Sequence, residues 1–525
     1  MPRTHEAGAD RRSRSLLRSA LETALPDTPV KRELIVNATA QEIRIALLED
    51  GLTAELFVER AAAPSVLGRI YSGRVGNVLP GMQSAFIDIG LDRDAFLYVA
   101  DLLPPPAGEE PGPGEGGEPP PPVRRRGPPI EGLLKQGQEI LVQVSKDALG
   151  GKGPRVTTQI SLPGRGLVFL PLASHRSVSR RVEPEEERLR LLDLAGDLPG
   201  DGGFIVRTAA GGASYPALES EARLLRVRWR EIQAAAEATA APACLSSQAD
   251  LAEKVLRDLA SPDMERIVVD DEATHRRCRD FVEAILPGLG HRVERYSGEE
   301  GIFEAFGVEK DLERALRRRV WLPSGGYIVI HPTEALVAID VNTGKYVGKS
   351  GFEETALTTN LEAAREVVRQ IRLRDLGGIL VIDFIDLEEE ESRRRLAEAL
   401  QEELKTDRAR SRVLKISDFG LVEITRQRMK RSLEALLCRS CPTCGGSGRV
   451  KNFETVCSQI QRELRKALPL LGGYAVVIRA HPEVAAAIRE NLPLLRRELG
   501  IPETRDVRAE AADGFHPEHF EIAGE

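Results

Sequence analysis

The sequence predicts a multidomain α/β protein that contains a small β-barrel, and three observations carry that prediction. The chain has 525 residues, enough for three or four domains at ~150 residues each. Short apolar runs separated by glycines between residues 68 and 99 are typical of a barrel. Between residues 320 and 437 apolar runs alternate with helical patterns, which indicates an α/β unit.

The composition limits the class of protein. A formal net charge of −8 argues against a protein that coats nucleic acid through bulk positive charge. Apolar runs such as 378–382 are far too short to cross a bilayer, which needs ~20 residues. The first thirty residues lack the apolar segment of a secretory signal. We therefore expect a cytoplasmic protein without a membrane span, in which any binding of nucleic acid depends on local charge.

The N-terminal third is predicted to consist mainly of strands. Residues 1–31 are polar and rich in arginine, so we expect a disordered extension, with a basic RNA-binding arm as the alternative. Glu33–Ala46 and Thr53–Val58 are predicted as paired strands, and the barrel strands as 68–75, 83–90, 95–99 and 138–144. Residues 104–129 hold 11 of the 33 prolines and six glycines, which predicts a mobile surface loop inserted into the barrel.

A concentrated basic segment follows the barrel. Residues 148–182 contain six lysines and arginines and no aspartate or glutamate. A solvated basic face is the usual reason for such a run, but the complete lack of acidic residues favours the binding of a polyanion.

The remaining elements are mostly helical or of mixed type. Helical periodicity covers Glu219–Ala240 and Asp250–Leu259. The α/β unit is predicted to hold a hairpin (327–330 and 335–340), a buried strand (379–384), and helices over Leu361–Arg372 and Glu388–Lys405. A small C-terminal α/β unit is expected around Thr455–Leu468 and Tyr474–Ile478.

Two aspartates end two apolar strands of the α/β unit. Asp340 closes one strand and Asp383 the other, and Asn342 supplies a neutral oxygen beside them. A carboxylate at the end of a buried strand needs a hydrogen-bond donor, a cation or water. Either aspartate alone is most simply explained as a helix cap or a turn residue. The pair at equivalent strand ends predicts a site for Mg²⁺ or Mn²⁺. Such a cation beside a phosphate is the usual apparatus of phosphodiester hydrolysis.

The cysteines include half of a zinc site. Cys441 and Cys444 form a C-x-x-C motif, and a structural zinc has four ligands. Only Cys438 or Cys457 could complete the set nearby, and the chain has no second C-x-x-C. One solution is a zinc shared by two protomers. A redox role is disfavoured because the motif lies after a helix in a glycine-rich turn.

Two further sets of residues suit RNA. Phe86 and Phe96 lie on barrel strands near Lys146 and Lys152, where aromatic rings either fill the barrel core or stack on bases, worth ~1–3 kcal/mol each. The strand 203–206 ends in Arg207-Thr208, and a guanidinium next to a hydroxyl fits either a terminal phosphate or a surface ion pair.

Several long motifs resemble the ribonuclease E/G family. They are Leu79–Phe86, Arg207–Ala209, Ala338–Asn342, Thr359–Ala364, Arg372–Gly378, Val381–Asp386 and Cys441–Cys444, in order and with compatible spacing from about residue 32 onward. Within that family the chain is most similar to the ribonuclease G branch, because it ends soon after the small C-terminal unit.

The resemblance implies a domain order. It comprises an RNase H-like subdomain (32–64 and 251–315), an inserted S1-type OB-fold barrel (65–157), a 5′-sensor region (158–250), a DNase I-like catalytic subdomain (316–437), a zinc link (438–452) and a small dimerisation domain (453–525).

The resemblance also implies roles for single residues. Asp340 and Asp383 are expected to bind Mg²⁺, with Asn342 as their orienting neighbour. The other expected positions are Arg207, Thr208, Gly164, Val168 and Arg180 for a 5′-monophosphate; Phe86, Phe96, Lys146 and Lys152 for RNA; and Cys441 and Cys444 for an intersubunit Zn²⁺.

The function implied is an Mg²⁺-dependent endoribonuclease that cuts single-stranded RNA, is stimulated by a 5′-monophosphate, and leaves 3′-hydroxyl and 5′-phosphate ends. Maturation of the 16S rRNA 5′ end and turnover of mRNA are the expected tasks, carried out by a homodimer or a dimer of dimers. Arg408 or Arg410 is expected to stabilise phosphorane charge or to form a structural salt bridge. The alternatives are a non-catalytic RNA-binding or assembly factor and a zinc-ribbon adaptor, and the second leaves the paired aspartates unexplained.

Overall fold

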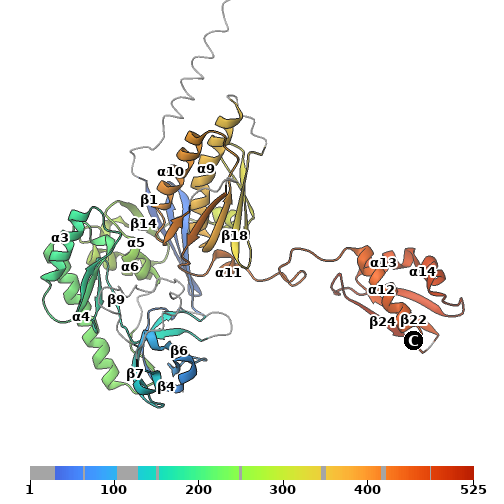
Figure 1. Cartoon of the computed structure of the whole chain (residues 1–525), viewed down its shortest axis with the longest axis horizontal. Coiled ribbons are helices and arrows are strands. Elements are labelled where there is room, and N and C mark those ends of the chain that lie inside the picture. Colours follow the sequence, from blue (N-terminus) through green and yellow to red (C-terminus); the bar gives the residue numbers. More distant parts are fainter. Residues whose placement is uncertain are drawn as a thin grey trace, which may run out of the picture. The chain divides into compact units, whose positions relative to one another are not determined.

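A computed structural model of the chain describes residues 30–62, 65–102, 128–148, 153–246, 251–344, 351–414, 421–472 and 474–525. It contains two compact units, residues 1–433 and 434–525, and each is described by itself (Figure 1). Residues 104–127 of the predicted insertion and residues 1–29 of the predicted extension lie outside the described residues.

The first sheet joins distant parts of the sequence. Its strand order is β15-β14-β1-β2-β3, built from β1 (Arg32–Ala38), β2 (Glu42–Glu49), β3 (Leu52–Arg60), β14 (Met264–Val269) and β15 (Val293–Arg295). Helices α5 (Leu251–Leu259) and α6 (Glu272–Ile285) share its apolar core. The single strand predicted over 33–46 is wrong, because the Thr39 hydroxyl accepts hydrogen bonds from the N–H groups of Gln41 and Glu42 and closes a turn between β1 and β2.

The predicted barrel is confirmed as a closed barrel of five strands, consistent with an OB-fold. The strands are β4 (Ile70–Leu79), β5 (Ser84–Asp88), β6 (Ala95–Tyr98), β7 (Glu139–Lys146) and β8 (Arg155–Thr157). They pair in the order β4-β5-β6-β8-β7, and β7 pairs back to β4. The short helix α2 (Ile130–Leu133) contributes Ile130 to the core, and β13 (Ala243–Cys244) adds to the outside of β4.

A four-stranded sheet follows the barrel. It has the order β11-β12-β10-β9, with β9 (Leu162–Pro163), β10 (Leu167–Leu170), β11 (Arg176–Val178) and β12 (Gly203–Val206). Helices α3 (Glu185–Gly196) and α4 (Tyr215–Ala238) pack on it. Helix α4 begins four residues before the predicted Glu219, because Pro216 lies in its first turn, where a missing N–H costs no hydrogen bond.

The predicted α/β unit is a six-stranded sheet with helices on one face. The order is β16-β17-β18-β19-β21-β20, with β16 (Arg319–Trp321), β17 (Tyr327–Pro332), β18 (Leu336–Asn342), β19 (Gly378–Asp383), β20 (Ser411–Val413) and β21 (Leu421–Arg426). Helices α9 (Phe352–Leu373) and α10 (Glu390–Leu404) lie side by side along it (Figure 1), and α7 (Ile302–Ala305) and α8 (Val308–Ala315) precede it.

Helix α9 begins nine residues before the predicted Leu361. The hydroxyls of Thr355, Thr358 and Thr359 donate to the carbonyls four residues earlier, so these threonines satisfy their own polar groups within the helix. A threonine-rich start conceals the helical pattern, since threonine has a low helix propensity.

The second unit is small and also of α/β type. After α11 (Leu433–Leu437), it contains α12 (Phe453–Ala467), β22 (Ala475–Ala480), α13 (Pro482–Glu490), α14 (Leu492–Leu499), β23 (Asp506–Ala511) and β24 (Phe520–Gly524), with the sheet order β23-β22-β24. In the described parts of the chain, no helix has the length and apolar character needed to cross a membrane.

Candidate active site

The two predicted aspartates lie directly opposite each other on neighbouring strands. Strands β18 and β19 are parallel, and Asp340 is the register partner of Asp383. Residues on either side of each aspartate are buried under the helices, so the alternation of a strand turns both carboxylates to the opposite face, where both are exposed. The structure therefore brings together the pair that the sequence singled out.

Charge and hydrogen bonding set the properties of this carboxylate pair. The Asn342 side-chain nitrogen donates to Oδ2 of Asp340 at 2.8 Å and holds that carboxylate in place. Partial burial raises the pKa of Asp383, and the negative charges of Asp340 and Asp386 raise it further. Asp386, which sequence reasoning quoted only as part of a motif, is thus the third acidic group of the site.

The donor set fits a hard cation. In the described residues, no group of three or more His, Cys, Asp or Glu side chains is arranged to hold a metal. Mg²⁺ does not need such a cage, since it commonly binds one or two carboxylates and keeps water and substrate phosphate as its other ligands. Asp340 and Asp383 supply two carboxylates on an exposed sheet face, which matches that requirement.

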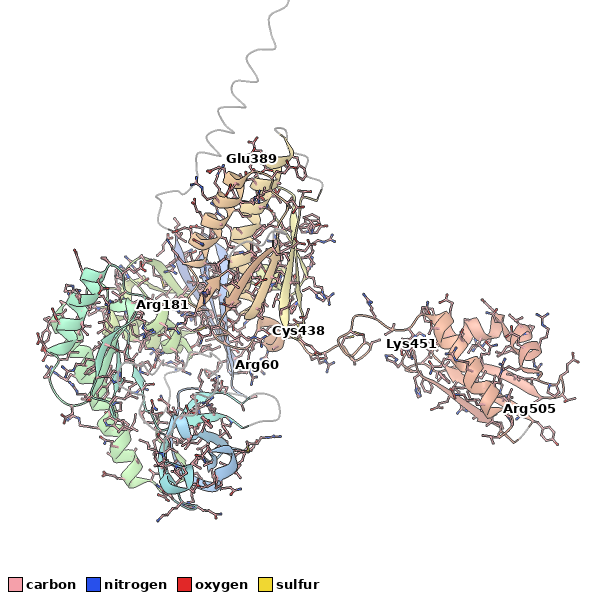
Figure 2. All side chains as sticks on the ribbon, viewed as in Figure 1. Arg60, Arg181, Glu389, Cys438, Lys451 and Arg505 are labelled. Carbon is pink, nitrogen blue, oxygen red and sulfur yellow. The ribbon has the colours of Figure 1, made fainter. Side chains whose placement is uncertain are left out.

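The loop after β19 is fixed by two polar side chains of α9. The buried amide of Asn360 donates to the carbonyl of Ile385 at 2.8 Å and accepts from its N–H at 3.0 Å. The Glu353 carboxylate accepts from the N–H groups of Glu388 and Glu389 at 3.0 and 3.2 Å (Figure 2 labels Glu389). These bonds hold the backbone on both sides of Asp386. Sequence reasoning assigned no role to Asn360, although it stands in one of the quoted motifs.

A basic edge forms where β11 and β12 end together. These strands are parallel and pair Val178 with Val206, so Arg180 and Thr208 emerge at the same edge. Arg207 donates to the carbonyl of Gly164 at 2.7 Å and pairs with Asp258 at 2.9 Å. Val168 differs from the others because its side chain is buried in a small apolar cluster.

Arg165 is a further cation at this edge. The sequence identified it as part of the basic segment 148–182 but not as a residue of the site. Burial lowers the pKa of Arg165, Glu221 opposes that effect, and the neighbouring Arg207 lowers it further. Arg165 and Arg207 thus bring two guanidinium groups to this edge, where Glu221 and Asp258 are their acidic partners.

The barrel presents its two phenylalanines outward. Phe86 and Phe96 are register partners on β5 and β6, with ring centroids 6.0 Å apart at 70°. The residues next to them in each strand, including Ile87 and Leu97, fill the barrel core, so the core alternative for these rings is excluded. Arg155 is the register partner of both Phe96 and Lys146, so the row of rings continues to Lys146, and the Arg155 guanidinium pairs with Asp101 at 2.7 Å. Lys152 lies outside the described residues.

The cysteine motif lies in the second unit, to which Cys438, labelled in Figure 2, also belongs. The backbone N–H groups of Cys444 and Thr443 lower the pKa of the Cys441 thiol, which favours a thiolate. Neither Cys438 nor Cys457 joins Cys441 and Cys444 in a metal-binding group among the described residues. The zinc site that the C-x-x-C motif predicts therefore stays a prediction.

Arg408 is structural in this fold. Its guanidinium donates to the buried Glu55 carboxylate at 2.7 Å, which is the salt-bridge alternative raised for it from the sequence.

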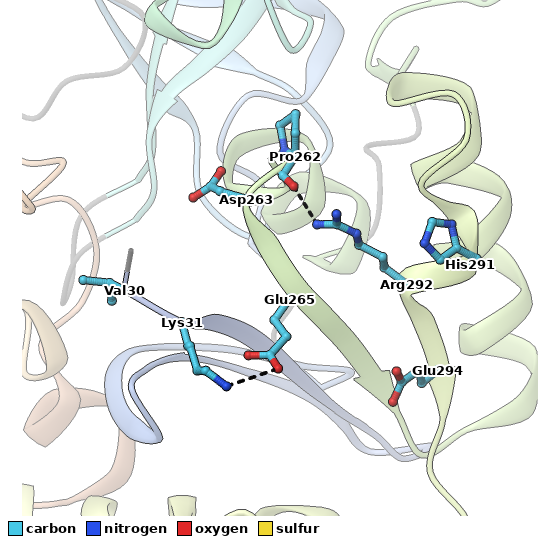
Figure 3. Close-up of a pocket in the computed structure, with 8 residues that line it drawn as sticks. All are labelled: Val30, Lys31, Pro262, Asp263, Glu265, His291, Arg292 and Glu294. Carbon is cyan, nitrogen blue, oxygen red and sulfur yellow. Dashed lines mark hydrogen bonds and ion pairs between the residues drawn. The ribbon is translucent and has the colours of Figure 1, made fainter. Parts of the chain in front are cut away.

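A pocket of about 430 Å³ opens elsewhere, beside β1, β14 and β15 (Figure 3). Its polar groups largely satisfy each other: Lys31 pairs with Glu265 at 3.6 Å, and Arg292 donates to the carbonyl of Pro262 at 2.6 Å. It contains neither Asp340 nor Asp383, so we place the candidate reaction centre on the open sheet face instead.

Comparisons with known proteins agree with the motifs. The ribonuclease E/G family matches residues 161–429. Ribonuclease G of Escherichia coli (strain K12) is 41% identical over 494 residues, which are 93% of this chain and 99% of that protein. Ribonuclease G of Haemophilus influenzae is 40% identical over 492 residues, again 93% and 99%. Ribonuclease E of Nostoc sp. is 38% identical over 419 residues, 79% of this chain and 58% of that protein.

Proposed function

The chain belongs to the ribonuclease E/G family and is an endoribonuclease, and we propose that it cuts single-stranded RNA at an Mg²⁺ held by Asp340 and Asp383. The observation that carries this proposal is the register of the two aspartates, which places two carboxylates side by side on an exposed sheet face. Because the chain is an endoribonuclease, the alternatives of a non-catalytic RNA-binding factor and of a zinc-ribbon adaptor are set aside.

The residues of the site divide the work. When bound, Mg²⁺ supplies an activated water and offsets negative charge on the phosphate. Asn342 orients Asp340 through its 2.8 Å hydrogen bond, and Asn360 fixes the backbone that carries Asp386. Attack of water on the phosphorus with loss of the 3′-oxygen leaves a 3′-hydroxyl and a 5′-phosphate.

The basic edge at Arg207 and Thr208 is proposed to receive a 5′-monophosphate. Arg165 and Arg207 supply positive charge, and Arg180 and Thr208 emerge at the same edge. A monophosphate at this position would accept hydrogen bonds from a guanidinium group and from the Thr208 hydroxyl.

The barrel is proposed to hold the RNA strand. Phe86 and Phe96 expose rings for base stacking, and Lys146 continues the same row with positive charge, whereas Arg155 is paired with Asp101. Because stacking is tolerant of sequence, this surface suits the single-stranded precursors of rRNA, including the 16S 5′ end, and mRNA in the cytoplasm.

The cysteines are proposed to link two copies of the chain. Cys441 and Cys444 would give two thiolates to a Zn²⁺ that a partner's equivalent pair completes, which yields a homodimer or a dimer of dimers. A dimer that survives strong chelation would contradict the shared zinc.

The test uses matched RNAs that differ only at the 5′ end. Wild type with Mg²⁺ should cut the 5′-monophosphate RNA faster than the 5′-triphosphate RNA, and Asp383→Asn should cut neither. If wild type and Asp383→Asn cut equally, the catalytic assignment fails. If wild type cuts both RNAs equally, only the sensor assignment fails. Arg207→Gln should remove the preference while it leaves cutting of the triphosphate RNA intact.

A further inference from the structure

An exposed tryptophan and a half-buried tyrosine lie on the same sheet face as the carboxylates. Trp321 is 62% exposed, although the residues on both sides of it, Val320 and Leu322, are buried in the core under α9 and α10. Its ring meets that of Tyr327 edge to face, with centroids 5.3 Å apart. The Trp321 ring, held by a second ring, is therefore a surface on which a planar ligand could stack.

The strand register places this pair beside the reaction centre. Trp321 pairs with Tyr327, and Tyr327 pairs with Asn342, the residue that bonds to Asp340. Residues directly opposite each other on paired strands share a face, so Trp321 lies in the row next to the row of the aspartates. Two strand spacings, roughly 9.6 Å, separate the β16 backbone from that of β18.

Arg319 supplies a cation to the same surface. It pairs with Val329, which pairs with Asp340, so Arg319 lies in the aspartate row. Its guanidinium carbon is 4.4 Å from the ring centre of Tyr327 and 5.8 Å from that of Trp321. In the described part of the chain no carboxylate pairs with Arg319, so its donors remain available to a phosphate.

We propose that Trp321, supported by Tyr327, stacks on a nucleobase of the RNA next to the scissile bond, and that Arg319 contacts the adjoining phosphate. This inference rests on the proposal that Asp340 and Asp383 form the cleavage centre. The stack holds the RNA strand across the open sheet face. The scissile phosphate then reaches the carboxylates while Trp321 holds the neighbouring base. A second copy of the chain is the competing occupant of this face, and the test separates the two.

The test uses the fact that the chain has only two tryptophans. Trp229 is half-buried on α4, so Trp229→Phe leaves Trp321 as the only indole and serves as the matched control for loss of a tryptophan. The test protein is the Trp229→Phe, Asp383→Asn double variant. Binding of a fluorescein-labelled 5′-monophosphate RNA decamer is followed by anisotropy. The same RNA should quench the Trp321 emission, and the two titrations should have the same midpoint. Abasic substitution at one position of the RNA should abolish the quench.

Activity provides the second readout. Trp321→Ala should lower kcat/KM roughly tenfold on intact RNA, Trp321→Phe should recover most of it, and Trp229→Phe should match wild type. The Trp321→Ala loss should vanish on the RNA that is abasic at the quenching position, which a merely structural effect would not do.

Four results would overturn the inference or its premise. Unchanged Trp321 emission while anisotropy reports bound RNA overturns the stack. An emission change that follows protein concentration without RNA assigns the face to a second copy and also overturns it. If Asp383→Asn still cuts RNA, the cleavage centre fails, whereas an inert Asp383→Asn with a fully active Trp321→Ala overturns the stack alone.

Discussion

Two sets of aspartates lie in the sheet of β16 to β21 or in the loops that lead into its strands, and they differ in what surrounds them. Asp375 and Asp407 are buried, at 2% and 3% side-chain exposure, and both pair with the equally buried Arg426 at 2.9 and 2.6 Å. Asp340 and Asp383 are exposed and face each other, and the group that bonds to Asp340 is a neutral amide. Among the described residues, an arginine neutralises the buried aspartates, whereas no cation pairs with the two exposed carboxylates where Mg²⁺ is proposed to bind.

The same contrast is present in the pKa values. Burial acts to raise the pKa of Glu55, but Arg408 and Lys430 outweigh it and lower the value to about 2. For Asp383, burial and the charges of its neighbours act in the same direction and raise the pKa. The acidic neighbours of Asp383 therefore oppose its ionisation, whereas the cationic neighbours of Glu55 favour its ionised form.

The largest effect is expected when the buried aspartates lose the arginine that neutralises them. Arg426→Met leaves Asp375 and Asp407 buried without a cation, and we expect a loss of about 3–5 kcal/mol in the free energy of unfolding, because an uncompensated buried charge is costly. Urea unfolding measures it. Arg412→Met on the neighbouring strand, where the side chain is exposed, is the matched control and should change little. Equal effects would contradict the contrast.

The next effect separates stability from activity in the exposed pair. Asp383→Asn should reduce kcat by at least about a hundredfold, since one of two proposed ligands of the cation is lost. Its free energy of unfolding should not fall, because the change removes repulsion from Asp340 and Asp386. A clear loss of stability would show that Asp383 has a structural cation partner.

A smaller effect concerns the loop that carries Asp386. Asn360→Ala leaves the carbonyl and N–H of Ile385 without their partners, which should cost about 1–3 kcal/mol of stability and lower kcat. Thr358→Ala on the same helix removes only a hydroxyl bond to its own helix and serves as the control. A destabilised variant with wild-type kcat would remove Asn360 from the positioning of the site.

The smallest effect is a pH dependence of the Asp383→Asn variant. Because the pKa of Asp383 is raised in the folded protein, its contribution to stability is present at low pH and is lost as pH rises through that pKa. The variant should therefore exceed wild type in stability at pH 7, and the difference should shrink as pH falls through and below the ordinary value of 3.8. Urea midpoints across that range measure it, and a difference that grows on acidification would contradict the assigned direction.

The sequence predicted the centre of the candidate site, but it did not predict most of the contacts that hold this site in place. Asp340 and Asp383 were found because apolar strands with acidic ends are a local pattern, and their parallel pairing then follows from the fold. The sequence did not determine whether the rings of Phe86 and Phe96 point into the barrel core or outward, because this depends on the alternation of the barrel strands. Asp407 and Arg426 come into contact only because separate elements pack together, and no local sequence pattern predicts such a contact.

Some missed features did have a signal in the sequence. Trp321 is one of only two tryptophans and follows three arginines, yet an isolated aromatic residue in a short strand is most simply assigned to a core. Arg155 and Arg165 were counted as charge without a position, because strand register decides what they face.

The measurement that tests the central claim most directly is divalent metal binding at the exposed pair. Mn²⁺ titrated into the zinc-saturated protein and followed by electron paramagnetic resonance should occupy a site that Mg²⁺ displaces. That site should be lost in Asp340→Asn and in Asp383→Asn, while Arg412→Met retains it. Equal Mn²⁺ binding by wild type and both aspartate variants would contradict the assignment of Asp340 and Asp383 as the metal ligands.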